Sequence, residues 1–168
     1  MTERRLTRCP ECGAMVSDVE GPTYGTGAPG CWAAFGEITG REFSDPAYRA
    51  HRRSPIDAYA VQHAGSPSPR ASKSAWVHLV GLCLVLEREF PVDAAVRAIA
   101  RLASEPPAFP WLEPPADRGS MTVVNVAAAE DVAAHVRAMQ DWADAAWAAW
   151  APHHPAVRRR ADALVGGR

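Results

Sequence analysis

The stretch Ser72-Lys-Ser-Ala-Trp-Val-His-Leu-Val-Gly-Leu-Cys-Leu-Val-Leu-Glu87 decides the fold class of this chain. Its apolar side chains cover nearly every face of a helix, and a helix that is apolar all round is buried in the centre of a protein. The apolar run from Ala75 to Leu86 is shorter than the roughly 20 residues that cross a bilayer. The sequence therefore predicts a central helix that carries one histidine, His78, into the core.

Helical spacing of apolar residues continues on both sides of this segment. It predicts helices over residues 31–43, 45–51, 54–63, 93–102, 127–150 and 156–165, while 121–126 is either a short extended piece or the lead-in to the next helix. Trp142, Trp147 and Trp150 have helical spacing and are expected in the core. No run of alternating strands is visible. We predict an all-α fold, a compact bundle of about five to seven helices. It forms one domain over 1–168, with a knuckle and Gly/Pro-rich arm over 1–30 and a helical core over 31–165.

The composition is that of an ordinary folded protein. The chain has 168 residues, 48% apolar and 22% charged, with a formal net charge of −1. A charge so close to zero argues against broad electrostatic binding to nucleic acid or to membranes. The N-terminus has no apolar secretory segment, so we expect a cytoplasmic protein with reduced thiols. A single lysine among many arginines, with abundant alanine, indicates a GC-rich bacterial source.

Cys9-Pro-Glu-Cys12-Gly13 has the spacing of half a tetrahedral zinc site. A second C-x-x-C is missing, because the next cysteine is Cys31 and Ala34 stands three residues after it. Cys31 is the natural third ligand, since the start of a helix favours a thiolate. Cys83 lies in the apolar helix and is expected to be a small core residue. The alternative for the N-terminal cysteines is a set of free thiols in a mobile arm.

The fourth ligand can be inferred from topology. The helix that starts at Cys31 runs away from the knuckle, and the helix over 54–63 should return antiparallel, which brings His63 level with Cys31. His51, His78 and Asp57 remain as alternatives. A histidine in the fourth position predicts a closed structural zinc site, whereas a water there predicts a catalytic one.

The polar residues of 51–63, together with His78, have three interpretations. They form a satisfied polar network that fixes a helical hairpin, they bind a metal, or they act in acid–base catalysis. No nucleophile stands at a readable spacing from a base, and no phosphate-binding loop or dinucleotide fingerprint is present.

The combined motifs resemble a family of uncharacterised bacterial proteins, a domain of unknown function. The resemblance is carried by C-P-x-C-G at Cys9–Gly13, G-C-W-A-x-F at Gly30–Phe35, a His-to-His segment at His51–His63, V-H-L at Val77–Leu79 and a Trp-rich helix at Trp142–Trp150. The last motif departs slightly, because its middle tryptophan stands at 147. The resemblance implies a single-domain protein and no particular activity. It marks as residues of interest Cys9, Cys12, Cys31, His51, Asp57, His63 and His78.

We therefore expect a small zinc-binding helical protein that acts as a binding or regulatory module, with an unknown protein or small molecule as partner. The alternative is a metal-dependent hydrolase or transferase that uses the Cys31, His63 and His78 region. A third hypothesis, nucleic-acid binding through the knuckle and the nearby arginines, is opposed by the near-neutral charge.

Overall fold

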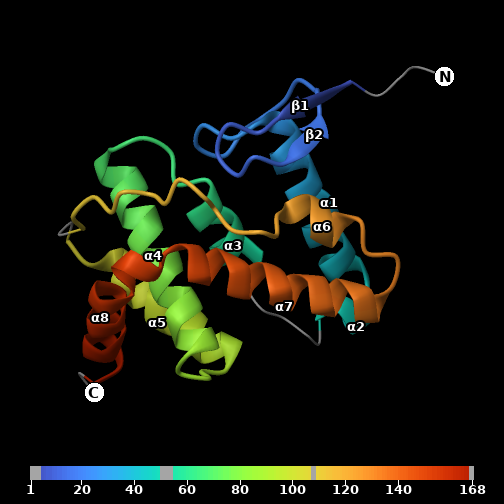
Figure 1. Ribbon diagram of the computed structural model, residues 1–168. Coiled ribbons are helices and arrows are strands. Elements are labelled where there is room, and N and C mark those ends of the chain that lie inside the picture. The colour runs from blue at the N-terminus through green and yellow to red at the C-terminus, as the bar shows by residue number, and fades with distance from the viewer. Residues whose placement is uncertain (1–4, 50–54, 107–108, 167–168) are drawn as a thin grey trace.

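The computed structural model describes residues 5–49, 55–106 and 109–166. Within these ranges, α-helices and one two-stranded sheet make up the regular structure (Figure 1). The elements in order are β1 (Leu6–Arg8), β2 (Met15–Ser17), α1 (Pro29–Ser44), α2 (Pro46–Arg49), α3 (Pro55–Gln62), α4 (Pro69–Leu86), α5 (Val92–Ser104), α6 (Val123–Ala127), α7 (Val132–Ala149), a 3-10 turn (Ala151–His153) and α8 (His154–Gly166). The predicted all-α fold is confirmed.

Helix α4 is the centre of the helical assembly, as its apolar sequence predicts. It packs against α3, α5, α7 and α8, and Leu79, Val80 and Leu84 are completely buried. The helix begins before the expected Ser72. The Ser68 hydroxyl caps it by accepting the Ala71 N–H, and a proline occupies the first turn.

The N-terminal arm contains a β-hairpin that the sequence did not predict. β1 pairs antiparallel with β2, with Thr7 opposite Val16. Strands of three residues are too short for an alternating pattern to be recognised. The hairpin packs against the start of α1, where Gly30 is required because an added Cβ would lie 2.3 Å from the Ser17 carbonyl oxygen. The two strands therefore hold the loop 9–14 at one end of the molecule, far from α8 in Figure 1.

The C-terminal half closes the core from the other side. Most of the segment 121–126, predicted as a short extended piece or as the lead-in to the next helix, belongs to the separate short helix α6. Helix α7 begins at Val132 because the Asp131 carboxylate caps it. Helix α7 lies along α3, and Trp142, Trp147 and Trp150 are buried as predicted. Buried apolar side chains from Cys9 to Ala161 make one continuous cluster. In the part of the chain that the structure describes, no helix is long and apolar enough to cross a membrane.

Candidate metal centre

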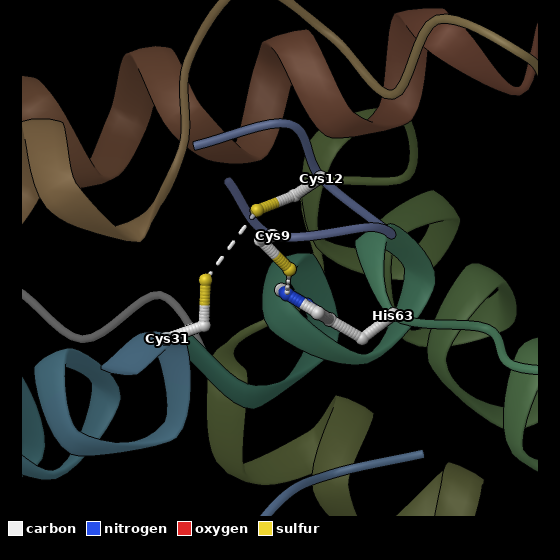
Figure 2. Close-up of side chains that lie close together, drawn as sticks. All are labelled: Cys9, Cys12, Cys31 and His63. Atoms are coloured by element: carbon white, nitrogen blue, oxygen red, sulfur yellow. Dashed lines mark hydrogen bonds between the residues drawn. The ribbon is translucent and has the colours of Figure 1, made fainter. Parts of the chain in front are cut away.

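Four residues with metal-binding side chains meet where the hairpin rests on the helical core (Figure 2). Cys9 and Cys12 come from the hairpin loop, Cys31 from the first turn of α1, and His63 directly follows α3. All four side chains are buried, and their ligand atoms lie within 4.8 Å of one another. The three separated segments thus bring three sulfurs and one ring nitrogen to a single point.

The distances between these atoms suit a tetrahedral ion. Cys9 Sγ lies 3.6 Å from His63 Nε2, and Cys12 Sγ lies 3.6 Å from Cys31 Sγ. The second distance is well beyond the length of about 2.05 Å of a disulfide. Zinc–sulfur and zinc–nitrogen bonds of about 2.3 and 2.05 Å in a tetrahedron give edges of about 3.8 Å between sulfurs and about 3.6 Å from sulfur to nitrogen. The cluster therefore has room for one ion of that size.

Hydrogen bonds outside the cluster orient its side chains. His63 Nδ1 lies 2.8 Å from the Tyr59 carbonyl oxygen. Because a carbonyl can only accept, Nδ1 carries the proton, and a neutral ring then turns an unprotonated Nε2 toward the sulfurs. The Tyr59 ring stacks on the imidazole at 4.1 Å, and the Ala28 N–H lies 3.4 Å from Cys9 Sγ. Gly27 allows this close approach, since a Cβ there would lie 2.7 Å from the imidazole ring.

The close contacts among the three thiols and the imidazole shift the pKa values of these groups. Contacts with the Cys12 and Cys31 thiols lower the pKa of Cys9, whereas contacts with the Cys12 and Cys9 thiols raise the pKa of Cys31. Burial acts to lower the pKa of His63, but contacts with Cys12 and Cys9 outweigh it and raise that pKa to about 9. Cys9 therefore has thiolate character, which its neighbours stabilise. A divalent cation would stabilise the remaining ligands in the same way by displacing their protons.

The donor set restricts which ions fit. Thiolate sulfur and imidazole nitrogen are the ligands of zinc and similar transition metals, whereas magnesium and calcium require oxygen. Four protein ligands would fill a tetrahedral coordination sphere, as in structural zinc sites, and would leave no place for a water.

The alternative ligands lie elsewhere or beyond the described ranges. Asp57 is buried in α3, where its Oδ1 lies 2.7 Å from Nδ1 of His78 in α4. This pair connects α3 to α4, and Gly81 leaves room for it, since a Cβ there would lie 3.0 Å from Asp57 Oδ2. The polar-network interpretation therefore describes Asp57 and His78. His51 lies outside the described residues.

Sequence reasoning included Gln62 in a polar network but identified the partners of neither Gln62 nor Glu11, two residues that support the site. Glu11, inside the C-P-E-C turn, accepts a hydrogen bond from Thr26, and its side chain lies 3.4 Å from Arg118. Gln62, next to His63, is fully buried. It donates to the Arg118 and Met121 carbonyls at 2.9 and 2.7 Å and accepts from the Trp142 indole at 2.8 Å. These contacts join residues far apart in sequence, so no local spacing indicates them.

The fold and the site define a class of small helical proteins with a buried Cys₃His cluster between an N-terminal hairpin and the core. The chain belongs to the family of unknown function DUF5946, whose model matches residues 7–151. The expected membership of an uncharacterised family is thus confirmed. Comparisons with curated proteins and with solved structures give no match.

Proposed function

We propose that Cys9, Cys12, Cys31 and His63 bind one zinc ion, and that this ion has a structural role in a small binding or regulatory protein. The observation that carries the proposal is the convergence of four buried ligand atoms within 4.8 Å. The ion would join the hairpin loop to α1 and to the end of α3, which apolar packing alone holds weakly because the strands are so short.

A structural role is favoured over a hydrolase or transferase for two reasons. With His63 as the fourth ligand, zinc would have no open site for water or substrate. In addition, Asp57 and His78 contact each other rather than the cluster, so they would not supply a base to the metal. The four free cysteines also suit a reducing compartment, and we propose the cytoplasm.

Metal analysis of the purified full-length protein tests the proposal. We expect about one zinc per chain by elemental analysis, in keeping with a four-ligand site. Cys9→Ser and His63→Ala should lower both the zinc content and the melting temperature. Cys83→Ser is the matched control, because Cys83 is equally buried in α4 but lies outside the cluster. It should keep its zinc.

Two results would contradict the proposal. One is a protein purified with zinc in the growth medium that neither contains zinc nor binds it stoichiometrically after reduction. The other is a Cys9→Ser variant that retains zinc and melts like the Cys83→Ser control. If chelation removes the zinc without changing the melting temperature, the zinc site would be supported but its structural role would be contradicted.

A further inference from the structure

A cavity of about 410 Å³ lies beside the cluster, between the loop 23–26 and the start of α4. This volume is within the usual range for a small-molecule site. His63 is the cluster residue that forms part of its wall. The remaining wall comes from the chain just before α4 and from the first turns of that helix, and it includes Ser66, Ser68 and Arg70.

The charge of the wall is positive. None of the lining residues is an aspartate or a glutamate, and Arg70 brings a guanidinium group. In the described ranges, no carboxylate lies within ion-pair distance of Arg70, in contrast to Arg118 and Arg158. The nearby acid Glu11 is bound by Thr26 and Arg118 instead. A ligand in this cavity would therefore meet an arginine whose charge is not neutralised by any carboxylate of the described residues.

Hydroxyl groups supply further donors. The lining residues with a hydroxyl are Thr23, Tyr24, Thr26, Ser66, Ser68 and Ser74. The Ser68 oxygen accepts the Ala71 N–H, so its own proton is available to a ligand. Tyr24 and Ser74 share one hydrogen bond at 2.8 Å, and only one of the two can donate it, so the other proton is available as well.

A group with several acceptor oxygens and a negative charge matches this wall. A phosphate accepts hydrogen bonds in several directions and pairs with a guanidinium, whereas a planar carboxylate has fewer directions to offer. Pro67 and Pro69 flank Ser68, so the hydroxyl-bearing segment loses little conformational freedom on binding. Tyr24, Ala64 and Ala71 leave apolar surface for an organic substituent.

We propose that this cavity binds a small phosphate monoester through Arg70 and the hydroxyls of Ser66, Ser68 and Ser74. The proposal goes beyond the zinc site, because the cavity and its charge do not require that a metal be bound.

The test is an NMR titration of the ¹⁵N-labelled full-length protein at constant ionic strength, with inorganic phosphate, phenyl phosphate and benzoate as probes. We expect saturable shifts in the amides of 23–26 and 64–74, with phenyl phosphate binding more tightly than inorganic phosphate and benzoate binding most weakly. Arg70→Gln should weaken phenyl phosphate binding by about fivefold or more, the effect of losing one charge-assisted contact at an exposed position. Lys73→Gln is the matched control, since it removes one positive charge from the same helix outside the cavity wall.

The proposal is overturned if neither phosphate probe gives saturable shifts, if benzoate binds as tightly as phenyl phosphate, or if both variants change the affinity equally. Zinc content is measured on the same samples. A protein that contains zinc but does not bind phosphate would contradict the cavity proposal and support the metal site. A protein that binds phosphate but contains no zinc would support the cavity proposal and contradict the metal site.

Discussion

Replacing Gln62 by leucine tests whether its buried amide holds α7 and the irregular segment between α5 and α6 against α3. The two side chains have similar volumes, so packing changes little and the loss is mainly of hydrogen bonds. Gln62 makes three, to the Arg118 carbonyl, the Met121 carbonyl and the Trp142 indole N–H. Each contributes about 1 kcal/mol net, and a buried donor left without an acceptor costs about 1–3 kcal/mol.

The expected loss of stability depends on which of the three partners can hydrogen-bond to water instead of to the amide. The Trp142 side chain is completely buried, so its N–H would stay unsatisfied in Gln62→Leu. The two carbonyls belong to an irregular segment between α5 and α6, where water can replace the amide. We therefore expect a loss of about 3–5 kcal/mol in the free energy of unfolding. For a chain of this size that is a fall of about 8–15 °C in melting temperature.

Thermal unfolding followed by circular dichroism measures this, with urea unfolding as the second assay. Gln140→Leu is the control, because the Gln140 amide contacts only a neighbour one turn along α7, Asp144, on an exposed face. It should change stability by less than about 0.5 kcal/mol. A fall of less than about 3 °C for Gln62→Leu, or one equal to that of the control, would refute the reasoning about the buried amide.

Two other predictions concern the hairpin contact and an ion pair. Gly30→Ala should destabilise the protein by about 1–3 kcal/mol, because the new Cβ would meet the Ser17 carbonyl and Val16. The control is Gly36→Ala in the same helix, which has open space around it and should stabilise the protein by about 0.5–1 kcal/mol. Equal effects of the two substitutions in urea unfolding would contradict this prediction. Glu87→Gln should lose stability at neutral pH, because the contact with Arg158 at 2.8 and 2.7 Å lowers the pKa of Glu87 to about 2. A carboxylate with a lowered pKa stabilises the fold above its ordinary pKa of about 4.5 and loses that effect as the pH falls toward 2, so the difference from wild type should shrink over that interval. Glu130→Gln, at an exposed position, is the control, and a difference that stays constant from pH 7 to pH 3 would count against the ion pair.

The fold was predictable where periodicity is strong. The apolar segment over 72–87 indicates a buried helix by itself, and the tryptophan spacing over 142–150 indicates a buried face, because both signals are local. The exact beginnings of α4 and α7 depend on single capping residues, Ser68 and Asp131, whose effect competes with the longer apolar pattern. The hairpin could not be predicted from the sequence, because its pairing rests on backbone hydrogen bonds over very few residues.

The four cluster residues could be predicted from the sequence, but the alternative ligands could not be excluded. Spacing alone indicated Cys9 and Cys12, the position at the start of a helix indicated Cys31, and the antiparallel return of the helix over 54–63 indicated His63. The same reasoning left Asp57 and His78 open as ligands, because which side of a short helix faces the cluster depends on packing against α4. The partners of Gln62 and Glu11 could not be foreseen, since Arg118 and Trp142 stand more than fifty positions away from them in the sequence.

Indole hydrogen bonds from α7 and from Trp150 directly after it connect the end of α3, next to His63, with a distant part of the chain. A peptide ending just after His63 would contain all four cluster residues, yet it would lack the Trp142 indole that holds Gln62 and the Trp150 indole that donates to the Val61 carbonyl at 3.2 Å. We therefore expect that a fragment able to assemble the cluster reaches at least from β1 to Trp150. The family match, over residues 7–151, has nearly the same limits. Helix α8 lies beyond this match and packs on α4 and α5, where its Val157 and Ala161 belong to the same continuous core.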